Sequence, residues 1–552
     1  MVIPAAYQST QALEAALGDP FDARAQVSFG QVLDDDESSR PPGSAFAALD
    51  AWRFPARLVP RRDGGELACF EELLSLLRAL ARRDPVLAVG YGSTLLASIP
   101  VWAWGGAAQR GETAAHVLAG RFGACAVSEE AAGSDLAAIA TRAERTAAGF
   151  RLDGAKWMIG NATRARFVTV LARSGPTPAL FLLDKKSLVP GEFRHLPKVP
   201  TLGLRGHDLS GIAFHGCGLP GTAALGPQGR GLEMLMATLR FTRTLAAGVA
   251  LGAADSALRI ALARAGERRL YGRPILSLAP VQGLLTGAYL DILISECVTI
   301  STARELSLDE GRGSLRSAIT KYLVPLLCER AIRDSGQVLA ARSYLRDGPP
   351  TGMLQKLSRD AAVIGVFEGT AQVQLAQLAS WLRTPSDRPD PSSLFRLARS
   401  AAPWRPERTG LGPGRPGPAD PLGTWEDADL PAGATARAAR LRAERDAVTR
   451  ELRHCRWTGR PPPGAFALAH RYCVLYAAGA CHRMWLANQD LLSPEFKEGQ
   501  WLAMCWDRLL ALTDLRPPEG SDACGTDELL QTMLRTAGSG RLLSIVELRH
   551  GR

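Results

Sequence analysis

A block of short strand-like segments between two helix-like blocks most constrains how this chain of 552 residues can fold. Between about residues 121 and 230, short apolar runs such as 167–171 and 179–183 alternate with Gly, Pro and Asp turns. Residues 1–120 and 231–384 instead carry apolar residues at helical spacing. We therefore expect a mainly α-helical protein with a central β domain.

The chain continues well past the second helical block. Residues 385–434 are rich in Pro, Gly and Arg, so we expect a linker or loosely packed strap that cannot bury enough apolar surface to order itself. Residues 435–552 return to helical spacing and predict an additional helical domain. Its expected core residues are Trp457, Trp485, Trp501 and Trp506.

Composition argues against several classes of protein. No apolar run approaches the roughly 20 residues of a membrane span, and the N-terminus lacks a basic segment followed by an apolar one. We therefore expect a cytoplasmic protein. Ten cysteines without a C-x-x-C pair and eight histidines without metal-ligand spacing argue against a zinc site or a disulfide framework. The net charge of +10 lacks the aromatic-interleaved stripe of nucleic-acid binders, but a diffuse basic surface can attract an acidic partner.

One carboxylate, Glu368, lies among apolar residues in the segment V-I-G-V-F-E-G-T-A-Q-V-Q at 363–374. Weak solvation disfavours the charged form of a carboxylate, which raises its pKa and makes it a competent general base. Gly369 would let a ligand approach the backbone closely. The alternative is a surface glutamate that ends one helix, with Thr370 capping the next.

This segment resembles the F/Y-E-G-T-x-Q motif of the acyl-CoA dehydrogenase family, and further segments resemble family motifs in the same order. They are A-V-S-E-E-A-A-G-S-D at 126–135, D-G-A-K-W-M-I-G-N at 153–161, L-R-G at 204–206, L-G-P-Q-G-R-G at 225–231, E-R-R-L-Y-G-R-P-I at 267–275 and Q-V-L-A-A at 337–341. The resemblance covers roughly residues 45–382. It implies an N-terminal helical domain, a middle β-barrel and a C-terminal helical bundle, followed here by the additional helical domain.

The resemblance implies FAD as the cofactor and assigns residues to it. The implied FAD-binding residues are Val127, Ser128, Met158, Gly160, Arg268, Tyr271, Gln337, Thr370 and Gln372. Met158 and Gly160 replace a family tryptophan and a threonine whose hydroxyl bonds flavin N5, which predicts altered tuning of the flavin. Ala279, Ala340 and Ala341 replace a glutamine and two glycines, so we expect FAD to bind less tightly. In relatives the contacts made by Arg268 and Tyr271 come from the neighbouring subunit, which implies a homodimer or homotetramer.

The resemblance also implies a reaction. Glu368 would remove the α-proton of an acyl thioester, carried by coenzyme A or by an acyl carrier protein, and the product would be a trans-2-enoyl thioester. Ser134, Arg243 and Gly369 would lie near the substrate. The electron acceptor is not indicated, and the unusual tail favours a biosynthetic pathway. Two alternatives remain open: a flavin-dependent oxidase or monooxygenase on the same scaffold, and a non-catalytic interaction protein that has lost FAD.

Overall fold

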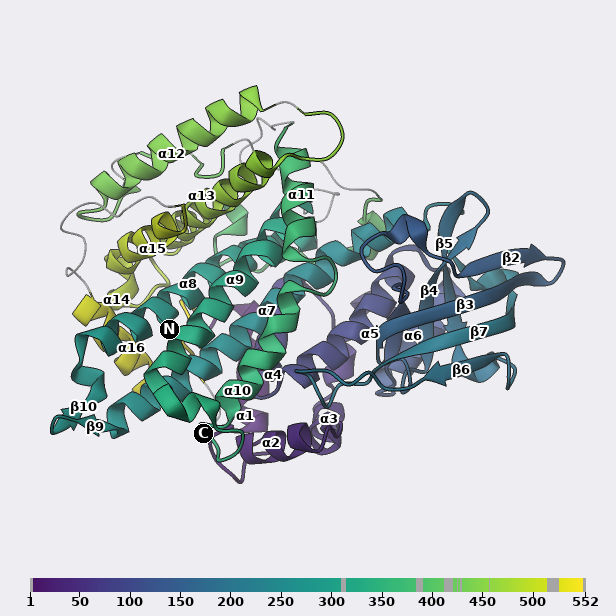
Figure 1. Cartoon of the computed structure of the whole chain (residues 1–552), viewed down its shortest axis with the longest axis horizontal. Helices are drawn as coiled ribbons and strands as arrows, with labels where there is room; N and C mark the ends of the chain where they lie inside the picture. The colour runs from purple at the N-terminus through teal and green to yellow at the C-terminus, as the bar shows by residue number, and fades with distance from the viewer. Residues whose placement is uncertain are drawn as a thin grey trace.

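The helices that precede the first strand form one side of a helical body, from which a β domain projects (Figure 1). The computed structural model describes residues 3–308, 314–383, 391–411, 420–423, 425–426, 429–455, 457–513 and 526–549. The N-terminal helices are α1 (Ala5–Leu17), α2 (Phe29–Glu37), α3 (Gly43–Ala51), α4 (Phe70–Ala81), α5 (Pro85–Trp104) and α6 (Ala107–Leu118).

Helices α4 and α5 show how local sequence sets these elements. The leucines at helical spacing in α4 are all buried: Leu73, Leu76, Leu77 and Leu80. Every other residue of this helix except Glu72 is buried as well, so α4 lies inside the helical body. The Asp84 side chain accepts a hydrogen bond from the Val86 N–H at 3.0 Å, and Pro85 occupies the first turn, where no N–H is needed. Helix α5 therefore begins at Pro85, with only residues 82–84 between it and the end of α4 at Ala81.

The strands pair in one sheet in the order β6-β7-β3-β2-β4-β5-β8, with β1 paired to β4. Their bounds are β1 (Gly123–Ala126), β2 (Arg142–Thr146), β3 (Gly149–Gly160), β4 (Phe167–Ser174), β5 (Thr177–Asp184), β6 (Phe193–Leu196), β7 (Leu209–Pro220) and β8 (Ala224–Leu225). The two strands expected at 167–171 and 179–183 are confirmed as β4 and β5. Where the sequence predicts a barrel, the described end strands β6 and β8 do not pair with each other.

Long helices resume directly after the sheet. They are α7 (Gly231–Glu267), α8 (Ala279–Leu308), α9 (Ser314–Leu339), α10 (Met353–Ala362) and α11 (Ala371–Leu382), with a small hairpin of β9 (Arg269–Leu270) and β10 (Arg273–Pro274) between α7 and α8. Helix α7 packs against α9, α8, α4 and α5, so it lies at the centre of the body. The helical bundle predicted from the sequence is confirmed.

Three helices have the length and apolar composition needed to cross a membrane, which corrects the expectation that no run approaches that length. They are α5, α7 and α8. Their apolar windows are buried inside the protein by 72%, 100% and 89%. This apolar surface therefore contacts other parts of the chain.

The additional helices lie against the bundle. They are α12 (Thr435–His454), α13 (Pro463–Ala487), α14 (Pro494–Lys497), α15 (Gln500–Leu510) and α16 (Thr526–Gly538), and helices α13, α15 and α16 all pack on α8. Trp485, Trp501 and Trp506 are buried, as predicted, whereas Trp457 is only partly buried.

The strap before α12 is better packed than its composition predicts. In its described residues 391–411, Phe395, Leu397 and Trp404 are buried. The Trp404 ring lies 5.0 Å from Phe70 of α4 and 5.5 Å from Phe241 of α7. A few apolar residues at the right positions therefore anchor a segment otherwise rich in Pro, Gly and Arg.

A buried charge cluster joins α1 to α4. Glu14 is fully buried and accepts hydrogen bonds from Arg82 at 2.7 Å and from Arg83 at 2.9 Å. Burial opposes ionisation of this carboxyl, but the two guanidinium groups outweigh burial and lower its pKa from 4.5 to about 2.

This cluster makes stability depend on acid. Because the pKa of Glu14 is lower in the folded state, its contribution is complete above about pH 4.5 and is lost as the pH falls through about 2. The shift corresponds to roughly 3 kcal/mol. We expect the free energy of unfolding in urea to fall less between about pH 4.5 and 2 in Glu14→Gln than in the parent protein. Glu144→Gln, at an exposed position, should show the same fall as the parent protein. An equally steep loss in Glu14→Gln would contradict this assignment.

Candidate active site

Glu368 lies in the turn between α10 and α11 with its backbone in the left-handed region, at φ 56°. A side chain held in this region signals local strain, which concentrates at functional sites. Its N–H donates to no acceptor within the part of the chain that the structure describes. Burial raises the pKa of the Glu368 carboxyl, as the sequence predicts, although nearby cations and a hydrogen bond partly oppose this effect.

Two consecutive residues of α7 hold this glutamate. The Thr242 hydroxyl donates to Glu368 Oε2 at 2.7 Å, and the Arg243 Nε donates to the Glu368 carbonyl at 2.6 Å. Arg243 is buried rather than part of a surface salt bridge, and burial lowers its pKa to about 10. A Cβ on Gly369, at φ +101°, would lie 3.1 Å from the Arg243 guanidinium, so a small residue is needed there.

Helix α9 contributes a buried lysine beside the same turn. Lys321 is 1% exposed, donates to the Ile364 carbonyl, and its ammonium lies 4.4 Å from the centre of the Phe367 ring. Burial, assisted by the charge of Arg243, lowers its pKa to about 7, although Glu368 opposes the shift. Its charge in turn favours ionisation of Glu368. Lys321 and Thr242 were not predicted from the sequence, in which a lysine on an apolar helix face was the one available signal.

The end of β1 approaches this carboxylate from the β domain. Burial and then the charge of Glu368 raise the pKa of the Cys125 thiol to about 12. Two residues further on, Val127 accepts a hydrogen bond from Lys156 at 2.9 Å, and Ser128 donates to the Trp157 carbonyl at 3.0 Å. The segments predicted to contact the flavin ring are therefore adjacent to each other.

Met158 and Gly160 complete this edge of β3. Met158 lies at a β-bulge with φ +59°, and its side chain is 40% exposed despite being apolar. A Cβ on Gly160 would lie 2.6 Å from Ser93 Oγ and 2.9 Å from His207 Nε2. A threonine here would therefore require Ser93 and His207 to shift, because their side chains occupy the space that a larger side chain would take.

Other predicted FAD residues lie away from this edge. Tyr271, at the tip of the β9-β10 hairpin, is 88% exposed, Gln337 is exposed near the end of α9, and Arg268 is half-buried. Gln372 is exposed on the first turn of α11, and Thr370 caps that helix by accepting from the Val373 N–H at 3.3 Å. Ser134 is exposed on the loop after β1. The predicted FAD-binding residues therefore fall into two groups on one chain: those at the edge of the β domain and those on the helical body.

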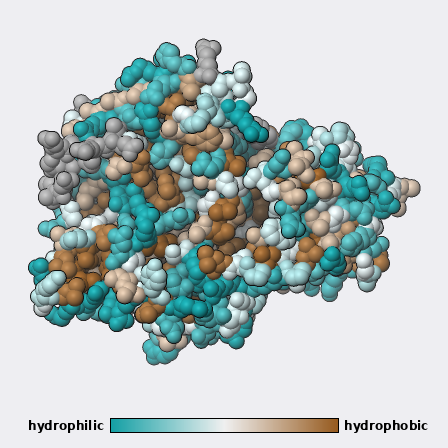
Figure 2. All heavy atoms as spheres, in the orientation of Figure 1, coloured by the Kyte–Doolittle hydropathy of each residue, from teal (hydrophilic) through white to brown (hydrophobic). Residues whose placement is uncertain are grey.

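A small pocket begins beside Arg243. It has a volume of about 200 Å³ and is lined by residues of α7, α9 and α11: Leu232, Glu233, Met236, Arg240, Arg243, Ser314, Ser317, Gln377 and Trp381. Arg240 donates to the Gly410 carbonyl of the strap at 2.9 Å. On the face shown in Figure 2, the molecule is hollowed where the helical body meets the β domain.

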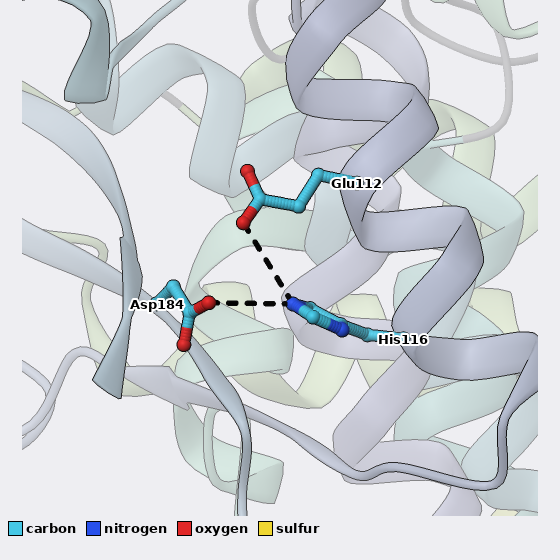
Figure 3. Close-up of side chains that lie close together, drawn as sticks. All are labelled: Glu112, His116 and Asp184. Atoms are coloured by element: carbon cyan, nitrogen blue, oxygen red, sulfur yellow. Dashed lines mark ion pairs between the residues drawn. The ribbon is translucent and has the colours of Figure 1, made fainter. Parts of the chain in front are cut away.

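A separate cluster of possible metal ligands joins α6 to β5 (Figure 3). His116 Nε2 lies 3.8 Å from Glu112 and 3.5 Å from Asp184. Arg121 lies 3.2 Å from Nδ1 of His116, and because a guanidinium only donates, the ring proton sits on Nε2. Arg166 already binds both oxygens of Asp184 at 2.5 Å. We interpret the cluster as a contact between the helical body and the β domain. Glu112 and His116 lie four residues apart on α6, a spacing that was not predicted as a metal site from the sequence.

Comparison with known proteins agrees with this geometry. Residues 124–217 match the family model for the acyl-CoA dehydrogenase middle domain, and residues 229–383 match the model for its C-terminal domain. The probable acyl-CoA dehydrogenase FadE25 of Mycobacterium tuberculosis is 27% identical over 345 residues, which are 61% of this chain and 87% of the relative.

Solved structures show the same fold. Butyryl-CoA dehydrogenase from Megasphaera elsdenii has a TM-score of 0.62 at 21% identity, over 68% of this chain and 97% of that one. The prolyl acyl carrier protein oxidase AnaB has a TM-score of 0.62 at 17% identity, over 68% and 98%. Neither family model extends past residue 383, so the additional helices lie outside both.

The fold and the two matched domains define an oxidoreductase of the flavoprotein class. The chain contains the middle and C-terminal domains of acyl-CoA dehydrogenases, a family whose members are FAD-dependent. The residues present fit that cofactor, because Met158 and Tyr271 expose large apolar side chains at both places where the resemblance puts FAD.

Proposed function

We propose that this protein oxidises the α,β-bond of an acyl thioester, with Glu368 as the general base. The observation that carries the proposal is a half-buried carboxylate with a raised pKa, oriented by Thr242 and Arg243 next to the predicted flavin edge. A base with a pKa closer to neutral can both exist deprotonated and accept a proton from a weak carbon acid. FAD, when bound, accepts the hydride from the β-carbon.

The chain's own groups have distinct tasks in this reaction. The Glu368 carboxylate takes the α-proton, and its unpaired N–H can donate to the thioester carbonyl, where negative charge develops. Thr242 holds the carboxylate at Oε2, and Arg243 fixes the turn through the backbone carbonyl. These contacts cost no reorganisation when the proton is transferred.

The working unit is a homodimer in this proposal. Arg268, Tyr271 and Gln337 remain predicted FAD ligands, although they lie on a different part of the chain from Met158. A second copy that supplies them would complete the cofactor site and cover Tyr271, which is 88% exposed. The planar fork of Arg268 suits phosphate oxygens of the FAD pyrophosphate.

Anaerobic addition of saturated acyl thioesters to the purified holoenzyme tests the proposed function. We expect the absorbance of bound FAD to bleach and a trans-2-enoyl thioester to form. Bleaching followed by hydrogen peroxide release or hydroxylated product under air would favour the oxidase or monooxygenase alternative, for which the absence of a threonine at Gly160 is the supporting observation. Purified protein without a flavin spectrum would favour the non-catalytic alternative.

The position of Lys321 predicts a shifted pH profile. Its charge stabilises ionised Glu368, so Lys321→Met should raise the pKa of the base and move the acid limb of kcat/KM to higher pH. The expected shift is about one pH unit, or about 1.4 kcal/mol. Lys198→Met is the control, because Lys198 also donates to backbone carbonyls but lies elsewhere. An unmoved acid limb in Lys321→Met would exclude this electrostatic role.

A further inference from the structure

Exposed arginines that the proposed reaction does not use lie at the end of α11, at the end of α12 and on the segment after α12. Arg383 follows the last residue of α11, and its guanidinium lies 4.9 Å from the ring of Trp457. Arg450 and Arg453 lie on the last turns of α12, and Arg460 follows Trp457 by three residues. We refer to these four arginines as the basic end. All four are exposed, and Figure 2 shows a largely hydrophilic surface over α12.

The arginines of α12 divide into paired and unpaired sets. Arg437 pairs with Asp507, and Arg445 pairs with Asp420 and Asp446. The acidic residues Glu444 and Glu451 of the same helix both pair with Arg471. Within the described part of the chain, Arg450, Arg453 and Arg460 form no ion pair, so their charge is available to a partner.

Helix α11 connects the basic end with the base. The helix is capped by Thr370, two residues after Glu368, and spans 12 residues. At 1.5 Å per residue it is about 18 Å long, which an extended 4′-phosphopantetheine arm can cover. Gln377 and Trp381 on this helix line the pocket that begins at Arg243. The pocket beside Arg243 therefore extends along α11 as far as Trp381, two residues before Arg383.

We propose that the basic end is the docking surface for an acidic acyl carrier protein, whose thioester arm lies along α11 and reaches Glu368. This inference rests on the proposed function and names the carrier of its substrate. Coenzyme A carries the same arm but ends in an anionic nucleotide, so the test below compares the two carriers directly. The basic end also belongs almost entirely to the segment beyond residue 383, which both family models leave out.

Unpaired charge at the rim of an interface mainly raises the rate of association and makes it sensitive to salt. Added salt should therefore reduce the rate with a carrier-bound substrate more than the rate with a small thioester, because screening shortens the reach of exposed charges. The arm itself contacts the pocket beside Arg243 in either case.

The test compares two charge-reversal variants in anaerobic single-turnover bleaching, which removes any electron acceptor from the measurement. The variant Arg450→Glu/Arg453→Glu reverses the basic end, and Arg173→Glu/Arg194→Glu reverses two other exposed, unpaired arginines on the β domain. Such surface changes rarely alter stability by more than about 0.5 kcal/mol. Saturated acyl groups from butyryl to dodecanoyl are offered on acyl carrier protein, on coenzyme A and on pantetheine.

We expect the basic-end variant to lose about tenfold or more in the apparent second-order rate with the carrier thioester, and to be unchanged with pantetheine. The control variant should match the parent protein with all substrates. Equal losses with pantetheine and carrier, a selective loss with coenzyme A, or no loss at all would overturn the docking proposal. If no thioester bleaches the flavin, pantetheine included, the proposed function fails and the docking surface fails with it.

Discussion

Replacing Glu368 by Gln is expected to abolish anaerobic bleaching of the bound flavin by substrate. A glutamine keeps the volume and can still accept from Thr242, so the turn and the cofactor site should persist. It cannot take the α-proton, and loss of a general base costs about 10²- to 10⁴-fold in rate. The measurement is stopped-flow absorbance of the oxidised flavin after mixing with a thioester substrate.

Glu329→Gln is the matched control for this experiment. Glu329 of α9 is also a half-buried glutamate whose pKa is raised by burial. Its carboxylate lies near Gly365, which belongs to the turn that carries Glu368. Neither Thr242 nor Arg243 binds it. We expect Glu329→Gln to bleach at the parental rate. Bleaching of Glu368→Gln at a comparable rate would refute the assignment of the base.

Replacing Asp291 by Ala is expected to have the largest effect on stability. Asp291 on α8 is fully buried and binds Arg330 of α9 at 2.8 Å and Arg508 of α15 at 2.8 Å. Removing the carboxylate leaves the Arg330 guanidinium without this partner and leaves Arg508 with Asp334 alone. Breaking a buried ion pair in this way costs about 3–5 kcal/mol.

Urea unfolding of the holoenzyme followed by tryptophan fluorescence measures this effect, because Trp501 and Trp506 lie on α15 beside Arg508. The control is Glu144→Ala, which removes an ion pair with Arg151 at an exposed site. Such exposed pairs contribute about 0–1 kcal/mol. A similar, small loss of stability in both variants would show that Asp291 does not anchor the additional helices to the bundle.

The order of elements was predictable because helices and strands have different apolar periods. Strands β4 and β5 occur at the two predicted runs, and helices α4, α7 and α8 fall within the two blocks of helical spacing. The strap was not predictable in the same way. Trp404 stands in a region rich in Pro and Gly, and only its contacts with Phe70 and Phe241 reveal that the segment packs.

The site was predictable as a motif but not as a set of neighbours. Glu368 stands out in a short segment, whereas its partner Thr242 lies 126 residues away on α7. Helical periodicity shows that a face is buried but not which residue of another helix it meets. Lys321 therefore carries no local signal beyond a charged residue on an apolar face. The limited space beside Gly160 likewise depends on Ser93, which comes from α5.

The segment after α16 has a consequence for how the polypeptide matures during translation. The Leu543 carbonyl accepts from Arg78 at 3.2 Å across 465 residues of chain, and Glu296 accepts from the Ile545 N–H at 2.9 Å. While a ribosome is still synthesising the later helices, Arg78 and Glu296 do not yet have these two backbone partners. Arg78 and Glu296, which also pair with each other at 2.6 Å, therefore gain these last partners only when the end of the segment has been synthesised.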